Sequence, residues 1–172
     1  MSTAAAVKCG TAGEADAADI TALRLAANAD LTARYGRGHW SGGLTERGVR
    51  AGMRSGRVLV ARRRGRIVGT LRLCTKKPWA IDVRYFAKSQ RPIYLVDMAV
   101  APGVQRQGVG RTLLEHAAEI AREWPGDAIR LDAYDAPAGA GGFYASCGYA
   151  EVGRASYRSV PLVYYELLLR PR

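Results

Sequence analysis

Cysteine is scarce in this sequence, and its spacing does not fit a shared metal or redox site. The three cysteines, Cys9, Cys74 and Cys147, stand far apart and form no Cys-x-x-Cys pair. This excludes a zinc ribbon and a dithiol redox motif, so we expect no metal site. A sparse, odd number of cysteines is typical of a reducing compartment, and we therefore expect the protein in the cytoplasm.

Long apolar runs are also missing. No stretch reaches the roughly 18 uncharged apolar residues that a membrane-spanning helix needs, so we expect no membrane contact. Residues 1–7 lack a basic start followed by a long apolar run. We therefore expect no signal peptide.

Acidic residues are few compared with basic ones. The chain has 15 Asp and Glu residues and 26 Lys and Arg residues, which gives a formal net charge of +11. Such a surface attracts phosphate groups, whether of nucleic acid, anionic lipid or a phosphorylated cofactor. Aromatic residues make up only 8% of the chain, and the basic residues are spread along it rather than clustered on one helix. This pattern disfavours a nucleic-acid-binding module.

The length and the apolar content are those of one globular domain. The chain has 172 residues, of which 48% are hydrophobic, so we expect a single domain over residues 1–172. Periodicity predicts two early helices, one of them carrying Ile20 and one capped by Thr45, and the spacing of Thr11 and Glu14 suggests a capping box before the first. The later elements are predicted as a β-hairpin over 57–74, a long excursion over 76–92, a buried strand over 93–100, a helix over 108–124, a strand over 128–134, a short helix over 143–147 and an antiparallel pair over 152–158 and 160–169. This order predicts an α/β or α+β fold with a mixed sheet.

The most informative segment lies between the buried strand and the strong helix. It reads Gln105-Arg106-Gln107-Gly108-Val109-Gly110-Arg111-Thr112. The first N–H groups of a helix have no partner within the helix, and a phosphate placed there satisfies them. Glycines let a diphosphate approach the backbone closely. A Walker loop is excluded because Gln105 stands where its first Gly should be, and a dinucleotide fingerprint is excluded because Leu113 stands where its third Gly should be.

In this context the sequence resembles the GNAT superfamily of N-acetyltransferases. The resemblance rests on Asp97-Met98-Ala99-Val100-Ala101-Pro102, on Gln105-x-x-Gly108-x-Gly110, and on Gly142-Phe143-Tyr144-x-x-x-Gly148-Tyr149. It implies a mostly antiparallel central sheet with helices on both faces and a splayed strand pair. It also implies acetyl-CoA as acyl donor, bound by Met98, Ala99, Val100, Gln105, Arg106, Gln107, Gly108, Val109, Gly110, Arg111 and Thr112.

The resemblance further implies a general acid at Tyr144, because a phenol near the thioester sulfur can protonate the leaving thiolate. The general base stays open. Val96 cannot act as a base, and Asp97 has the opposite parity from Met98, so we expect a buried and structurally paired Asp97. Asp132, Asp135 or a water relay are the alternatives. Family members often carry an Asn near the position of Pro137, which puts that contact in doubt here.

The resulting hypothesis is direct transfer of an acetyl group from acetyl-CoA to a primary amine of a small molecule or peptide. The alternative is a non-catalytic acyl-CoA-binding or sensor domain. Core packing is an equal alternative for each aromatic residue among those expected to line the acceptor site. The expected residues are His39, Trp40, Trp79, Asp82, Tyr85 and Phe86. The edges of the sheet leave room for a homodimer.

Overall fold

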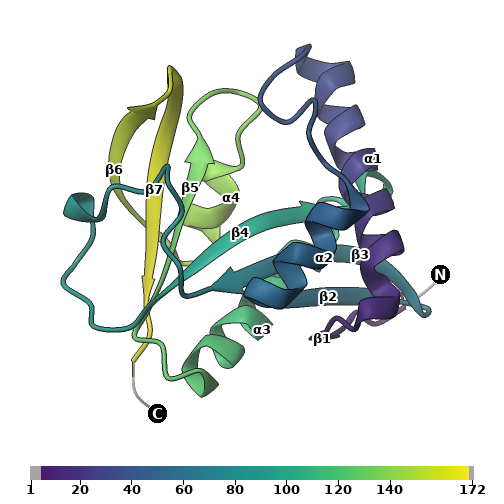
Figure 1. Ribbon diagram of the computed structural model, residues 1–172, viewed down its shortest axis with the longest axis horizontal. Coiled ribbons are helices and arrows are strands. Elements are labelled where there is room, and N and C mark those ends of the chain that lie inside the picture. Colours follow the sequence, from purple (N-terminus) through teal and green to yellow (C-terminus); the bar gives the residue numbers. More distant parts are fainter. Residues whose placement is uncertain (1–4, 171–172) are drawn as a thin grey trace. The chain divides into compact units, whose positions relative to one another are not determined.

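The computed structural model describes residues 5–170 of the chain, and Figure 1 labels its elements. Helices and strands follow one another in an order close to the predicted one. In chain order they are β1 (Lys8–Thr11), α1 (Ala17–Tyr35), α2 (Glu46–Ser55), β2 (Arg57–Arg63), β3 (Arg66–Cys74), β4 (Pro92–Val100), α3 (Val109–Glu123), β5 (Ala128–Tyr134), α4 (Gly141–Ser146), β6 (Ala150–Tyr157) and β7 (Val160–Leu168).

The strands form a seven-stranded sheet in the order β1-β2-β3-β4-β5-β7-β6. Strands β1 and β2, β2 and β3, β5 and β7, and β6 and β7 pair antiparallel, whereas β4 and β5 pair parallel. This mixed, mostly antiparallel sheet with helices confirms the predicted fold class. The residues group into two compact units: unit 1 runs up to Leu73 and includes Asp97–Ala117, and unit 2 consists of Cys74–Val96 and the residues from Ala118 onward.

Unit 1 has helices on both faces of its strands. Side chains alternate along β2, so Val58 and Val60 share one face. They form a buried cluster with Ala17 and Ile20 of α1 and Val49 of α2. On the other face α3 approaches so closely that a Cβ at Gly69 of β3 would lie 3.1 Å from Val109 Cγ1. The predicted placement of helices on both faces is therefore confirmed within this unit.

The predicted hairpin and the predicted helix cap of unit 1 are both confirmed. Arg64 and Gly65 link β2 to β3 with φ of 50° and 79°, the two positive values of a type I′ turn. Thr45 precedes α2, and its Oγ1 accepts a hydrogen bond from the backbone N–H of Gly48 at 3.1 Å. This contact satisfies one of the N–H groups that a helix start leaves without a partner.

The predicted capping box at Thr11 is wrong. Thr11 ends strand β1, where it pairs with Leu59 of β2. A 3-10 turn over Glu14–Asp16 follows, and the backbone N–H of Gly13 donates to the Asp16 carboxylate at 2.9 Å. The real cap therefore lies two residues further along the chain, and pairing with β2 decided the conformation of Thr11.

Unit 2 is built on β5, β7 and β6 and on the segment between β3 and β4. Phe86 and Ile81 from that segment pack in a buried cluster with Tyr94 and Tyr164. The excursion predicted over 76–92 is confirmed, with one 3-10 turn at Val83–Tyr85. No helix among residues 5–170 combines the length and the apolar character that crossing a membrane requires.

A buried ion pair joins two strands of unit 2 to the excursion. Arg130 Nε of β5 lies 2.8 Å from Glu166 Oε2 of β7, with side chains only 5% and 4% exposed. The backbone of Ala87 completes the pair, because its N–H donates to Glu166 and its carbonyl accepts from Arg130. Buried charges require such full pairing. The pair therefore fixes the excursion to the sheet.

Strand β4 is less buried than its apolar sequence predicts. Ile93, Tyr94 and Leu95 are buried, whereas Val96–Val100 are only partly buried. The register between β4 and β5 runs over three pairs, from Pro92 with Ala128 to Tyr94 with Arg130. The predicted splay of the two strands stays a prediction.

Candidate functional site

The segment between β4 and α3 is a tight loop in unit 1. A 3-10 turn over Pro102–Val104 follows the strand. Arg106 and Gly108 then adopt positive φ values of 60° and 81°. Only glycine takes such a conformation without strain, which explains the residue type at 108. These two positions turn the chain into α3.

The backbone of this loop is exposed up to Gly108, whereas Val109 and Gly110 are buried. Within the part of the chain that the structure describes, no protein acceptor is found for the N–H groups of residues 106–110. The first helical hydrogen bond runs from Thr112 N to Gly108 O at 3.0 Å. Residues 105–108 are exposed. A row of unpaired amides at the positive end of a helix dipole suits a phosphate group.

Three of the polar side chains predicted to bind the cofactor instead brace the loop. Gln105 Nε2 donates to Val100 O at 3.2 Å, and Gln107 Nε2 donates to Gly103 O at 3.4 Å. Thr112 Oγ1 donates to Gly108 O at 3.1 Å. A ligand at this loop would therefore meet the backbone of these residues rather than their side chains. The side chain of Arg106 is exposed.

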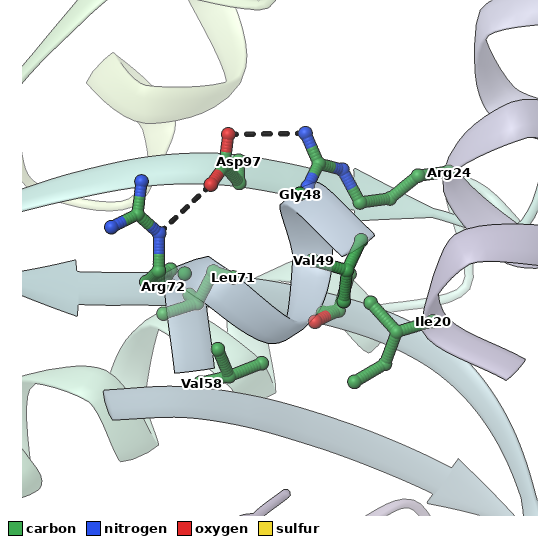
Figure 2. Close-up of a pocket in the computed structure, with 10 residues that line it drawn as sticks. Ile20, Arg24, Gly48, Val49, Val58, Leu71, Arg72 and Asp97 are labelled. Atoms are coloured by element: carbon green, nitrogen blue, oxygen red, sulfur yellow. Dashed lines mark hydrogen bonds and ion pairs between the residues drawn. The ribbon is translucent and has the colours of Figure 1, made fainter. Parts of the chain in front are cut away.

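Asp97 is an unusual residue within β4. Its φ of 58° is left-handed in the middle of a strand. Its Oδ1 accepts from Arg24 Nη2 at 3.0 Å, and its Oδ2 accepts from Arg72 Nε at 2.9 Å (Figure 2). The predicted pairing of Asp97 is confirmed, although its side chain is 33% exposed rather than buried.

The left-handed conformation of Asp97 also corrects the expectation that side chains alternate regularly between the two faces along this strand. Alternation holds only while the backbone stays extended, and a bulge resets it. The faces of Tyr94 and Val96 therefore do not determine those of Met98 and Val100. Both carboxylate oxygens of Asp97 are engaged by arginines, which is the structural pairing that the sequence predicted.

Tyr144 lies on α4 in unit 2, inside a group of aromatic rings. Its ring centroid is 5.4 Å from that of Phe143, 6.0 Å from that of Tyr149 and 5.9 Å from that of Tyr165. The residue is 7% exposed. Burial raises the pKa of the Tyr144 hydroxyl above its usual value, and the charges of Asp132 and Cys147 raise it further. Tyr144 is therefore protonated at neutral pH and can act only as a proton donor.

The remaining carboxylates and the glycine-rich segment of unit 2 are also defined. Asp135 pairs with Arg154 Nη1 at 3.2 Å. Asp132 lies near enough to raise the pKa of both Tyr144 and Tyr164. Gly141 after Pro137 is closely packed, because a Cβ there would lie 2.7 Å from the Tyr165 hydroxyl, whereas a Cβ at Gly142 would meet nothing within 4 Å.

The residues predicted for the acceptor site do not form one group. His39 and Trp40 belong to unit 1, where their ring centroids are 5.1 Å apart. In unit 2 Phe86 is a core residue under the guanidinium of Arg130, at 4.9 Å. Trp79 is 82% exposed.

Two further predicted acceptor residues of unit 2 have defined partners. Asp82 is held by Arg84 at 2.6 Å. Tyr85 lies against Tyr164, with ring centroids 5.4 Å apart, and closes over Gly153, where a Cβ would lie 2.1 Å from the Tyr85 ring. Core packing, the alternative reading of the aromatic residues, therefore holds for Phe86, whereas Tyr85 packs on Tyr164 with 41% of its surface exposed.

Sequence reasoning missed Arg24 and Arg72. Nothing in their local sequence separates them from the other arginines of the chain. The only signal was the charge of Asp97 within an apolar strand, which required partners but did not identify them.

Comparisons with known proteins bear on the family and the fold of the chain. The sequence model described as the acetyltransferase (GNAT) family matches residues 26–149. The fold is similar to that of yncA from Salmonella typhimurium, a putative acetyltransferase solved with acetyl-CoA, at 19% identity and a TM-score of 0.71 over 97% of this chain and 96% of that one. It is also similar to a ribosomal-protein-alanine N-acetyltransferase from Brucella melitensis, at 22% identity and a TM-score of 0.70 over 94% and 99%. A search of curated proteins finds no match.

Proposed function

Because the chain belongs to the acetyltransferase (GNAT) family, we propose that it transfers the acetyl group of acetyl-CoA directly to a primary amine of a small molecule or peptide. The observation that carries this proposal is the row of unpaired amides over residues 106–110, at the start of a helix. These amides and the exposed Arg106 fit a diphosphate, which acetyl-CoA carries.

The donor supplies an activated acyl group in the form of a thioester. In the proposed reaction a C–N bond forms to the acceptor amine, the C–S bond breaks, and the amine loses a proton. Backbone N–H groups of Met98–Val100 are proposed to hold the acetyl carbonyl and to stabilise the negative charge that develops on its oxygen.

Tyr144 is proposed to donate its proton to the leaving sulfur. The hydroxyl is protonated at neutral pH and can donate to the sulfur, although its raised pKa makes it a weaker acid than a thiol, whose reference pKa is about 8.5. Asp97 has no role as base in this proposal. The loss of the amine proton is assigned to solvent or to Asp132.

We place the reaction in the cytoplasm. All three cysteines are free thiols. Free thiols persist in a reducing compartment.

The decisive experiment is calorimetric titration of acetyl-CoA into Gly108→Asp. The added carboxylate lies beside the loop amides, so we expect the affinity to fall about tenfold or more through repulsion of the diphosphate. Gly65→Asp is a matched control, because both glycines have similar positive φ, 79° and 81°, and open space around the added Cβ. This control should bind acetyl-CoA normally.

Normal affinity in Gly108→Asp would contradict the proposed donor site. An assay for released thiol over a panel of amines tests catalysis separately. Binding of acetyl-CoA without thiol release on any amine would favour the acyl-CoA-binding or sensor alternative.

A further inference from the structure

The cluster formed by Asp97, Arg24 and Arg72 carries a net positive charge. Figure 2 shows Asp97 between Arg24 of α1 and Arg72 of β3, with one carboxylate oxygen toward each. Both arginine side chains are mostly buried, at 21% and 22% exposure. Two guanidinium groups and one carboxylate leave one positive charge without compensation.

No other carboxylate compensates this charge within residues 5–170. Glu46 of the neighbouring helix α2 is already held by Arg50 at 2.6 Å. Among these residues Arg24 bonds only to Asp97, and it does so through Nη2. Arg24 Nε and Nη1 therefore lack an acceptor there. Arg72 uses a further nitrogen, Nη1, to donate to Ser55 Oγ at 3.3 Å. A partly buried cation with free donors is a favourable place for an anion.

A small cavity adjoins the cluster. Its volume is about 20 Å³, enough for one water-sized group, and a single oxygen atom of an anion is of this size. Thr70 adds a polar side chain to the wall. The apolar part of the lining is formed by Ile20, Val49, Val58 and Leu71.

The position of the cluster connects it to the reaction. Asp97 directly precedes Met98–Val100, the residues to which the proposed function assigns the acetyl carbonyl. The cluster is therefore anchored in β4 at the residue next to this segment. All of these residues belong to unit 1.

We propose that Arg24 and Arg72 bind a carboxylate of the acceptor, so that the preferred substrates are amino acids whose carboxylate is next to the primary amine. This inference rests on the proposed function. Guanidinium groups match carboxylates in geometry and in charge. Asp97 keeps lone pairs beyond its two hydrogen bonds and accepts one from an N–H of the neighbouring amino group, which reacts after it has lost a proton to solvent or to Asp132. The cluster thereby orients the amine toward the acetyl group.

The test compares acceptors that differ only at the carboxylate. L-phenylalanine, L-phenylalaninamide and phenethylamine, and likewise L-leucine, L-leucinamide and isoamylamine, are assayed by thiol release at saturating acetyl-CoA. We expect kcat/KM for the free amino acids to exceed that for both analogues without a carboxylate by about tenfold or more, the value of a hydrogen bond between charged groups. Equal or better use of the analogues without a carboxylate would overturn the inference and leave the proposed function intact.

Two variants locate the preference. Arg24→Gln and Arg72→Gln should each raise the KM for the amino acid about tenfold or more, leave the KM for acetyl-CoA unchanged, and remove the preference over phenethylamine. Arg24→Lys should restore part of it. Arg34→Gln on the same helix is the matched control, because Arg34 pairs with Asp30 and is 46% exposed.

Thermal unfolding of each variant separates loss of folding from loss of recognition. If Arg72→Gln unfolds, the substrate preference of Arg24→Gln alone tests the inference. A preference that survives in Arg24→Gln would contradict the inference. Absence of transfer to every amine by wild-type protein that binds acetyl-CoA would reject both the inference and the proposed function.

Discussion

Tyr144 combines a buried ring with a hydroxyl whose pKa is raised by burial and by Asp132. The ring belongs to the packing of unit 2, and the hydroxyl is the part available for chemistry. The two roles can be separated by removing the oxygen alone. Tyr149 offers a comparison in the same aromatic group, because its buried hydroxyl has no hydrogen-bond partner among residues 5–170.

We predict that Tyr144→Phe lowers kcat about 100-fold, the usual contribution of a general acid, while the affinity for acetyl-CoA stays nearly unchanged. Steady-state kinetics and calorimetry measure the two quantities. Tyr149→Phe should change kcat little. A loss of acetyl-CoA binding in Tyr144→Phe would indicate a structural role, and equal loss of kcat in both variants would point to packing.

The sequence around Asp97 predicted that this residue has partners but did not identify them. Its charge within the apolar run Ile93–Val100 required partners, and this expectation is confirmed. The partners come from residues 24 and 72, far away in the sequence. Local sequence contains no record of such contacts, since long-range proximity follows from the folded chain.

At the scale of elements, periodicity and turn residues predicted most of unit 1. The apolar stripe of α1, the cap at Thr45 and the hairpin turn at Gly65 are local features, and each is confirmed. Strand β1 was missed because it has only four residues, Lys8–Thr11. Its extended conformation depends on pairing with β2, which is a tertiary contact.

The cap of α2 allows a direct test at this scale. We predict that Thr45→Ala lowers the free energy of unfolding by about 1 kcal/mol, because the Gly48 N–H loses its acceptor. Denaturant titration measures the change. Thr75→Ala, at an exposed position directly after β3, removes the same atoms outside any helix; it is the control and should have little effect. Equal stability of Thr45→Ala and wild type would show that water replaces the cap without cost.

At the scale of the whole molecule, the net charge of +11 is the strongest feature of the composition. Many arginines are engaged with carboxylates rather than gathered on one surface. Arginines that form ion pairs with carboxylates include Arg24, Arg34, Arg50, Arg62, Arg72, Arg84, Arg130 and Arg154. Dispersed and paired charge does not form the basic stripe of a nucleic-acid-binding protein.

We therefore predict only weak, non-specific binding of duplex DNA, with a Kd of about 10⁻⁴ M at physiological salt. Fluorescence anisotropy with a labelled duplex measures it across a salt series. The same series run with acetyl-CoA in calorimetry is the control, because a localised diphosphate site should keep much of its affinity. Submicromolar DNA binding that persists at physiological salt would revive a nucleic-acid function.

The sequence by itself determined the order of most elements, the loop at 105–112 and the family, because these depend on local periodicity, glycine positions and contiguous motifs. Only the tertiary structure decided which side chains meet. It turned Gln105 and Gln107 back onto their own loop, buried Tyr144 among rings, and brought Arg24 and Arg72 to Asp97. The contacts of Asp97 with Arg24 and Arg72 join residues distant in the chain, and so they exist only once the chain is folded.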